Sequence, residues 1–545
     1  MLKSVAMQSA RLLAVLLFFS FSSVVLAQSF SLSLEEVSWE ALPGVQSFAE
    51  AQWNEQWLIV GGRLDGLHRR QPFASMASDG RNVNLWVVDP AGQQLWSRAL
   101  TDLPTELQEQ LAATNLSHYQ DGDQLVLIGG YAYSATAGDH ITFPRLTVID
   151  LPGFITAVQE GGSLEEHVQS VADERMAVAG GQLGKIGDHF LLVGGHRFDG
   201  RYNPHGPDHG PGFSQTYTNA VRRFRIDEGE SGILIADFSE TVDEVNLHRR
   251  DYNLVPQILP DGSLGYTAFS GVFQHTVDLP FLNSVDFTAD GYAVNNDFAQ
   301  YLSHYHSAWA AMYSAADNQM HTIFFGGISQ FYVNEADEVV EDTDVPFVRT
   351  ISRVTRGASG LREEVKMEVD MPGLLGAGAD FFPLPGLVEV SPGILDLDAL
   401  PDDAPQLIGY LFGGIESTAP NVFWSNEDEP SVASARMLAV YLDKSSVTGS
   451  REARLEGDNP LRLRVFPNPT AGALQVGLQP FEAGSLTLFV QDSTGRIVRQ
   501  FAHTATSAEE QLIDLDLESL PAGPYQLILS DGYYLRAAPF IRSGE

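Results

Sequence analysis

A short apolar run that ends in two glycines recurs along this chain, and it limits the fold more than any other feature. The first copy is WLIVGG at 57–62, and a decayed copy, YTAFSG at 266–271, carries serine in place of the first glycine. Intact copies follow the first at 125–130, 190–195, 322–327 and 409–414. A unit that returns along a chain is typical of a fold in which similar small units pack side by side. The sequence therefore predicts one body made of six related units.

Each apolar run belongs to a pattern of four short strands. A polar turn such as 54–56 or 121–123 precedes the run, and another strand-like run, such as 115–119, precedes the turn. Two runs joined by a tight polar turn indicate a β-hairpin. A third and a fourth run follow, for example at 83–89 and 94–100. Four antiparallel strands repeated six times predict an all-β, six-bladed β-propeller.

The stretch from 57 to 104 resembles a kelch repeat. Besides the apolar run, the residues that carry the resemblance are Gly61, Gly62, Asn84, Asp89, Trp96, Leu103 and Pro104. The kelch family implies a propeller of six or seven blades. Its members include copper radical oxidases, whose cofactor requires a cysteine bonded to a tyrosine, and a sialic-acid mutarotase that uses no cofactor. The chain contains no cysteine, which excludes the copper radical type and also disulfides.

The N-terminal segment 33–42, SLEEVSWEAL, resembles the fourth strands of other units, such as QLWSRAL at 94–100. The last unit has strand-like runs at 407–412 and 437–443 but no fourth run before a polar segment begins. An exposed strand edge invites pairing with other chains. We therefore expect the N-terminal strand to complete the sixth blade of a propeller that spans 28–443.

The last part of the chain reads as a separate domain. Residues 444–462 form a polar linker, and short alternating strands at 463–545 predict a small Ig-like β-sandwich. Its motif residues are Pro467, Asn468, Pro469, Gly472, Gly495, Gly523 and Tyr525. Together they resemble the type A C-terminal sorting domain of the type IX (Por) secretion system. This resemblance implies that the type IX machinery exports the protein from a Bacteroidetes-type bacterium, with surface attachment or release; an ordinary adhesive Ig-like module is the alternative.

The N-terminus predicts a secretory signal peptide at 1–27. Lys3 and Arg11 flank a short apolar segment, and the expected cleavage site follows Ala27. A retained anchor helix is the alternative, but the segment is short for a membrane span, and no later stretch reaches about 18 apolar residues. With 32 Lys and Arg against 70 Asp and Glu, the formal net charge is −38. Such a charge disfavours nucleic acid and anionic membrane surfaces as partners.

Long loops follow four of the glycine pairs, at 63–81, 196–216, 328–347 and 415–435. Antiparallel blades place these loops on one face, which we call the long-loop face and expect to bind the ligand. The candidate ligand-binding residues on it are His68, Arg69, Arg70, His248, Arg249, Arg250, Asp251, His304 and His306. The planar guanidinium group of arginine suits carboxylates and sugar hydroxyls. The alternative is that these arginines tie acidic loops together.

The loop after the third glycine pair contains His196, His205 and His209, whose imidazoles could hold zinc or another transition metal. Its many glycines and prolines favour a solvated loop instead, so no cofactor is expected. The chain also lacks the sequence patterns of zinc peptidases, serine hydrolases and phosphate-binding loops.

These features predict an exported surface propeller that binds a glycan or a protein through its long-loop face. A cofactor-independent carbohydrate-active enzyme, such as an epimerase, mutarotase or lyase, is one alternative. A structural component of the cell surface or of gliding is another. Convergence of His248, Arg250 and His304 on one pocket would favour an enzyme, and their separation would favour a binding surface.

Overall fold

The computed structural model describes residues 30–69, 74–203, 212–230, 232–334, 339–423 and 430–445 of the first part of the chain. In the last part it describes 462–471, 473–479, 484–492, 497–507, 509, 511–517, 519–530 and 535–543. The predicted signal peptide, Arg70, His205, His209, Gly472 and Gly495 lie outside these ranges. The chain divides into two compact units, with the boundary after Ser445. None of the described helices is long and apolar enough to cross a membrane.

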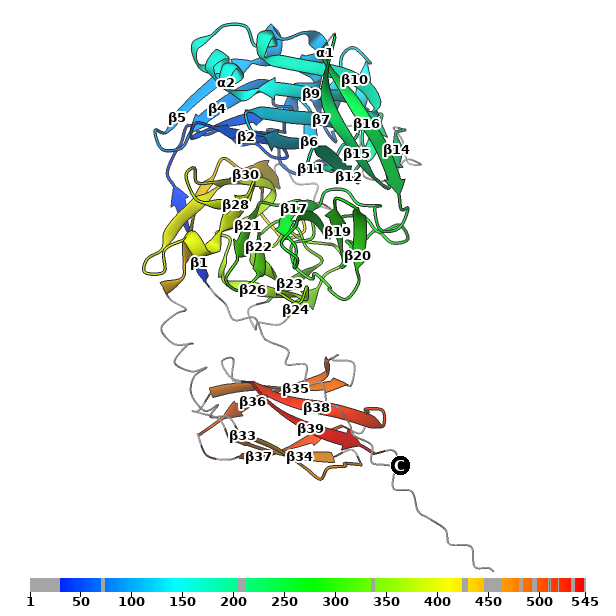
Figure 1. Cartoon of the computed structure of the whole chain (residues 1–545), viewed down its shortest axis with the longest axis vertical. Coiled ribbons are helices and arrows are strands. Elements are labelled where there is room, and N and C mark those ends of the chain that lie inside the picture. The colour runs from blue at the N-terminus through cyan, green and yellow to red at the C-terminus, as the bar shows by residue number, and fades with distance from the viewer. Residues whose placement is uncertain are drawn as a thin grey trace, which may run out of the picture. The chain divides into compact units, whose positions relative to one another are not determined.

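The described strands of the first unit form six sheets of four to seven strands, each containing a set of four antiparallel strands, and one two-stranded sheet. Figure 1 shows their arrangement. The first sheet contains β2 (Ala49–Trp53), β3 (Gln56–Val60), β4 (Asn84–Asp89) and β5 (Gln94–Ala99). The second contains β6 (Thr114–Asp121), β7 (Gln124–Ser134), β9 (Pro144–Asp150) and β10 (Val168–Ala177), extended by β8 (Asp139–Thr142), β13 (His196–Asp199) and β14 (Ser214–Tyr217). The third contains β11 (Gln182–Ile186), β12 (His189–Val193), β15 (Ala220–Gly229) and β16 (Gly232–Val242).

The remaining three sheets follow the same order. The fourth contains β17 (Asn253–Ile258), β18 (Leu264–Phe269), β19 (Ser284–Thr288) and β20 (Gly291–Asn295). The fifth contains β21 (Trp309–Ser314), β22 (Gln319–Phe325), β25 (Thr350–Arg356) and β26 (Arg362–Asp370), beside β28 (Glu389–Ser391) and β29 (Ile394–Asp396). The sixth contains β27 (Leu374–Pro383), β30 (Gln406–Ser417), β32 (Met437–Asp443) and β1 (Ser31–Val37), with β31 (Ser431–Ala433) beside β30.

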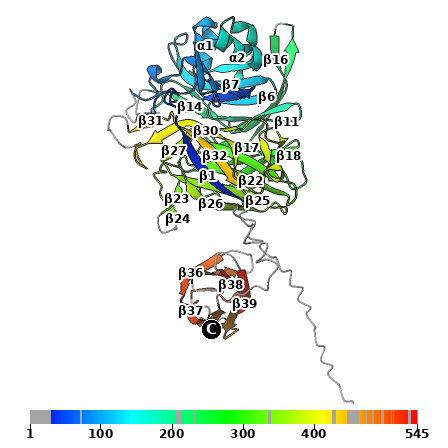
Figure 2. The same ribbon diagram turned by 90° about the vertical axis from the view of Figure 1, so that its left-hand side faces the viewer.

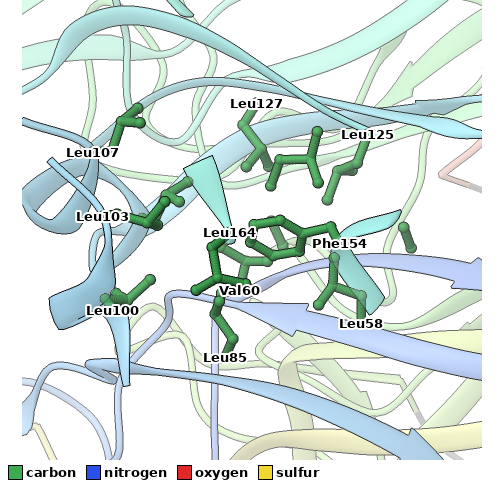
Figure 3. Packing of buried hydrophobic residues seen from close by; sticks show 14 of the residues in the cluster. Leu58, Val60, Leu85, Leu100, Leu103, Leu107, Leu125, Leu127, Phe154 and Leu164 are labelled. Atoms are coloured by element: carbon green, nitrogen blue, oxygen red, sulfur yellow. The ribbon is translucent and has the colours of Figure 1, made fainter. Parts of the chain in front are cut away.

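Short elements fill the connections between these strands. They are α1 (Thr105–Leu111), α2 (Leu151–Glu160), the hairpin of β23 (Phe331–Val333) and β24 (Val339–Glu341), and the 3-10 turns Ser78–Gly80, Leu100–Asp102, Glu165–His167 and Leu397–Ala399. The strand pattern did not predict the two α-helices. Both contribute to the core between the first and second sheets, where Phe154 of α2 meets Leu58 and Leu125 (Figure 3).

The apolar runs are buried on both faces because each sheet is packed between two others. In β3, Leu58 and Val60 face the core shared with the second sheet. Trp57 and Ile59 point the other way, because successive side chains alternate along a strand, and join a core with Phe382 of the sixth sheet. Trp57 and Phe382 stack with ring centroids 4.0 Å apart. The first sheet is therefore packed against both the second and the sixth.

The same kind of core joins every consecutive pair of sheets. The second and third share Ile128 and Leu192, and the third and fourth share Val193 and Leu254. The fourth and fifth sheets share Phe269 and Phe324, and the fifth and sixth share Phe325 and Leu411. With the contact between the sixth and first sheets, the six sheets form a closed series.

The doubled glycines bind each sheet to the next through the backbone. The second glycine of every pair donates its N–H to a carbonyl at the start of the following sheet. The six bonds are Gly62 to Ala113 (2.9 Å), Gly130 to Val178 (2.9 Å), Gly195 to Arg249 (2.7 Å), Gly271 to His304 (3.2 Å), Gly327 to Leu375 (3.1 Å) and Gly414 to Val45 (2.8 Å). Both residues of each pair have a positive φ, including Ser270 at 53°. Glycine adopts a positive φ without steric strain, which explains why the pair recurs at these positions.

A second set of hydrogen bonds runs around the inner ends of the sheets. Six residues, one before or within the first strand of each sheet, each donate a backbone N–H to the carbonyl of the previous member. In order, Ser47 donates to Gly378, Gly378 to His306, His306 to Asp251, Asp251 to Gly180, Gly180 to Asn115 and Asn115 to Ser47, at 2.8–3.3 Å. We call this closed circle the backbone belt. Five of its members, all except His306, have a positive φ.

The N-terminal strand β1 is the outermost strand of the sixth sheet. It pairs antiparallel with β32, from Ser31 opposite Asp443 to Val37 opposite Met437 (Figure 2). Phe30 and Leu32 are buried in the core between the fifth and sixth sheets. Residues near the two ends of the first unit thus share one sheet.

The second unit contains two antiparallel sheets that face each other (Figure 1). One contains β33 (Arg462–Phe466), β34 (Ala473–Gln479) and β37 (Gln511–Asp516). The other contains β35 (Gly484–Asp492), β36 (Ile497–Ala505), β38 (Gly523–Ser530) and β39 (Leu535–Arg542). Leu474, Leu488 and Leu527 belong to the core between them. The Asn468 side chain donates to the carbonyl of Pro539 (3.0 Å) and accepts from the N–H of Ile541 (2.9 Å), which fixes this motif against β39.

Candidate functional site

A cavity of about 410 Å³ opens over the backbone belt of the first unit. Its volume lies within the range of small-molecule sites, about 300–1,000 Å³. Belt members Ser47, Asn115, Asp251, His306 and Gly378 line it. The other described lining residues are Gln46, Arg63, Leu67, His68, Met76, Thr114, Tyr131, Ala179, His196, Phe198, Tyr202, Arg250, Phe273, Asp278, Tyr305, Ile328, Thr343, Asp344, Val345, Phe347, Ala377, Ile415, Pro420, Asn421, Val422 and Phe423.

The lining comes from all four long loops that the sequence places on one face. Arg63 and His68 belong to the first loop, His196 and Tyr202 to the second, and residues of 343–347 and 420–423 to the third and fourth. Five lining residues stand directly after the second glycine of a pair: Arg63, Tyr131, His196, Ile328 and Ile415. The hydrogen bond made by that glycine therefore determines where the following side chain enters the cavity.

Arg250 and Asp251 form an ion pair in the cavity wall. The Nη1 atom of Arg250 donates to Oδ2 of Asp251 at 2.9 Å, and Nε donates to the hydroxyl of Tyr217 at 3.0 Å. The guanidinium also lies over the ring of Phe273, 5.3 Å from its centroid. Burial opposes the charge of Arg250, but Asp251 and the surrounding tyrosines raise the pKa of this guanidinium overall. Burial also raises the pKa of Asp251, and Arg250 acts against that shift.

Arg63 enters the cavity from the first sheet with its charge already paired. Its Nε donates to Oδ1 of Asp65 at 2.7 Å, and its Nη2 donates to Oδ2 of the same carboxylate at 2.5 Å. Nη2 also donates to the carbonyl of Ala77 at 3.0 Å. Because the guanidinium is buried and its Nε and Nη2 atoms are already hydrogen-bonded, it shapes the wall more than it offers donors to a ligand.

His68 lies in the aromatic part of the cavity wall. Its ring meets Tyr202 edge-on at 4.8 Å and Phe423 edge-on at 5.5 Å. Burial lowers the pKa of His68 to about 4, and the nearby charge of Arg250 contributes to that shift. Nδ1 is buried without a hydrogen-bond partner among the described residues. His68 is therefore a neutral ring near neutral pH.

His306 connects the cavity to a group of buried acids between the first strands of the sheets. Its Nε2 lies 3.8 Å from Oδ1 of Asp380 in β27. Burial, with a contribution from His118, lowers the pKa of His306 to about 4. Burial and the neighbouring Glu50 raise the pKa of Asp380 well above its ordinary value. Burial raises the pKa of Glu50 to about 7. These shifts reduce the number of charges held between the strands.

Three of the predicted ligand residues have structural surroundings instead. Arg249 is 1% exposed and donates to the carbonyls of Asn246 (2.7 Å), Ser270 (2.5 Å) and Asn283 (3.0 Å); burial lowers its pKa to about 9. His304 uses both ring nitrogens, with Nε2 2.9 Å from the carbonyl of Gln300 and Nδ1 accepting from the N–H of Gln330 at 3.0 Å. His248 stacks on Tyr217 at 3.7 Å, outside the lining.

Most of the remaining predicted residues line the cavity. His68, Arg250, Asp251 and His306 line the cavity, whereas Arg69 does not. Of the predicted metal ligands, His196 lines the cavity, and its Nδ1 lies 2.9 Å from Nε2 of Gln215. No group of three or more His, Cys, Asp or Glu side chains able to hold a metal occurs among the described residues.

Sequence reasoning missed the aromatic lining, including Phe198, Tyr202, Phe273, Tyr305 and Phe423. Aromatic residues in loops look like core residues when only their type is known. A positional signal was nevertheless present, because several lining residues stand within two positions of the second glycine of a pair.

Comparison with known proteins identifies the second unit. Residues 464–536 match the secretion system C-terminal sorting domain. No protein with a curated description matches the chain. Among solved structures, one titled "Structure of YjhT" aligns with a TM-score of 0.40 and 10% identity, covering 72% of this chain and 93% of that one. The last part of the chain is a type IX secretion sorting domain, which marks the protein for export to the cell surface or the extracellular space.

Proposed function

We propose that the first unit is a six-bladed, kelch-like β-propeller that binds a glycan in the cavity on its long-loop face. On this proposal each of the six sheets is one blade. The closed series of cores, the glycine-pair bonds and the backbone belt support a ring with six equivalent positions. β1 would then complete the sixth blade, in the way that closed propellers protect their edges.

The cavity over the belt is the observation that carries the ligand proposal. It combines aromatic walls, from Tyr202, Phe273 and Tyr305, with the hydrogen-bonding groups of Arg250 and Asn115. Apolar walls with a few convergent polar groups are typical of sites for small ligands. A sugar has apolar ring faces and hydroxyls at its edge, so it matches both parts of such a wall. The sorting domain places this site outside the cell, where glycans are abundant ligands.

Binding without catalysis is favoured because His248, Arg250 and His304 do not converge on one pocket. Of His248, Arg250 and His304, Arg250 alone is among the described lining residues. Both ring nitrogens of His304 are engaged by the backbone, and the ring of His248 stacks on Tyr217 outside the described lining. We propose that binding requires no metal or other cofactor, so treatment with EDTA should leave affinity unchanged.

The test is binding of the full chain to a glycan array, followed by calorimetry with the best ligand. Arg250→Ala should weaken binding by tenfold or more, because it removes a central polar group from the cavity. Arg222→Ala is the matched control, since Arg222 pairs with Glu240 on the outer strands of the third sheet.

Three results would contradict the proposal or redirect it. Equal loss of binding in both arginine variants would place the ligand outside the cavity. Capture of a protein partner without any glycan signal would indicate a protein-binding surface. Chemical conversion of the bound sugar, followed by NMR, would support the alternative of a cofactor-independent carbohydrate-active enzyme.

A further inference from the structure

The arginines of the cavity look like anion-binding groups until their partners are considered. Arg63 is held by Asp65 through both carboxylate oxygens, and Arg250 is paired with Asp251 at 2.9 Å. Each positive charge is therefore matched by a carboxylate that belongs to the protein. An incoming carboxylate would have to compete with ion pairs that are already formed, and the Arg250–Asp251 pair is also largely shielded from water.

The other charged groups of the cavity are negative. Asp278 and Asp344 line its rim as exposed residues, and the structure describes no ion pair for either side chain. His68 and His306 add no positive charge to the cavity near neutral pH, because burial lowers the pKa of each to about 4. The described lining thus contains two arginines, each paired within the protein, and two further carboxylates without a cation beside them.

Several hydrogen-bonding groups remain available to a ligand. Within the described residues, Nη2 of Arg250 makes no hydrogen bond, since its neighbours Nε and Nη1 take Tyr217 and Asp251. The hydroxyls of Tyr202 and Tyr305 likewise have no partner among the described groups. These donors and acceptors suit hydroxyl groups, which can accept from a guanidinium and donate to a phenol oxygen.

Resting on the glycan-binding function proposed above, we propose that the cavity holds an uncharged saccharide unit and rejects an acidic one. The ring of the sugar packs against the aromatic wall of Tyr202, Phe273 and Tyr305. Its hydroxyls meet Nη2 of Arg250 and the two phenol groups. A uronic acid, a sialic acid or a sulfated sugar is repelled by Asp278 and Asp344, and the positive charges of both arginines are already matched by Asp65 and Asp251.

The test uses saccharides in matched sets, each with a neutral hexose, its uronic acid and its 2-amino-2-deoxy derivative. Binding to the full chain is measured by calorimetry at pH 7 and low salt. The neutral member of the best set should bind at least about tenfold more tightly than its uronic acid, as expected for repulsion by carboxylates a few ångströms away. The amino derivative should bind as well as the neutral sugar or better.

Asp251→Asn provides the second arm. It removes the carboxylate charge that pairs with Arg250, and asparagine tolerates the positive φ of 49° at this position. The ratio of uronic-acid affinity to neutral affinity should rise about tenfold in this variant. Because Asp251 belongs to the belt, the double variant Asp278→Asn/Asp344→Asn gives an independent check at the exposed rim. It should raise the same ratio, with a smaller effect.

The outcomes separate the two proposals. Tighter binding of the acidic member to the unaltered chain overturns this inference and leaves glycan binding intact. An affinity ratio that neither variant changes also overturns it, because charge would then not decide selection. Failure of every saccharide to bind the unaltered chain overturns the glycan function and this inference together.

Discussion

The glycine pair between the sixth and first sheets gives the sharpest test of how the ring is held together. Gly413 has a φ of +75°, and an alanine there adopts a conformation that costs about 1 kcal/mol or more. A Cβ atom at this position would lie 2.6 Å from the carbonyl oxygen of Val45 and 2.8 Å from the ring of Phe48. Real Cβ atoms do not approach other heavy atoms so closely, so the first sheet must move away from the sixth.

That movement breaks further interactions whose size can be assessed. The N–H of Gly414 donates to the same Val45 carbonyl at 2.8 Å, and its loss removes about 1 kcal/mol. Displacing Phe48 disturbs the packing around Trp57, which adds about 1–3 kcal/mol for an overpacked core. Gly413→Ala should therefore destabilise the first unit by roughly 3–5 kcal/mol in total.

Gly386→Ala is the matched control for backbone strain. Gly386 has a φ of +86° near the same sheet, but a Cβ there would meet nothing within 4 Å. This variant should lose only about 1 kcal/mol. Urea unfolding followed by tryptophan fluorescence measures both, because all seven tryptophans lie before residue 446 and report on the first unit. Equal losses in the two variants would refute the idea that close approach between sheets explains the glycine pair.

Four further variants test other features of the chain. Ser270→Gly should change stability by less than about 1 kcal/mol, because relief of strain at φ 53° offsets loss of the 2.7 Å bond from Ser270 to Phe281. Deletion of residues 30–37 should lower the melting temperature of the first unit in calorimetry, since it removes buried Phe30 and Leu32. Burial raises the pKa of Glu50 to about 7, so the folded state binds this proton more tightly than the unfolded state does. The free energy of unfolding should therefore fall as the pH rises from about 4.5 to about 7. Glu50→Gln should remove about 2 kcal/mol of that fall, measured by urea titrations at both ends of this pH range. A chain truncated after Ser445 should remain in the periplasm on fractionation, whereas Gly386→Ala should still be exported.

The fold was predictable to the extent that its requirements are local in the sequence. A positive φ and a close neighbouring carbonyl demand glycine, so each contact between sheets leaves a mark that recurs along the chain. The helices α1 and α2 were missed because they lie in connections between strands, and a pattern of strand-like runs predicts nothing about the connections. The three extra strands of the second sheet, β8, β13 and β14, were missed for the same reason, since they lie in loops after the glycine pairs.

The cavity was predictable as a face but only partly as a set of side chains. Arg249 and Arg250 are neighbours in the sequence and have the same chemistry, yet one is buried behind the wall and the other lines the cavity. Consecutive residues of an extended segment point in opposite directions, so composition alone cannot choose between them. The pairing of Arg63 with Asp65, and of Arg250 with Asp251, also appears only when the loops are folded. On the proposal above, that pairing favours an uncharged ligand where free arginines would favour an acidic one.

The glycine pair links neighbouring sheets, and the residue after it lines the cavity in five of the six repeats. The N–H of the second glycine donates a hydrogen bond to the next sheet, which fixes the backbone at the point where the chain enters the cavity wall. The residue that follows the pair varies in type and lines the cavity as Arg63, Tyr131, His196, Ile328 or Ile415. On the proposed binding function, substitution at these five positions would change the ligand while the glycines stay the same. Recognition would then be separable from the fold at the residue after five of the six glycine pairs.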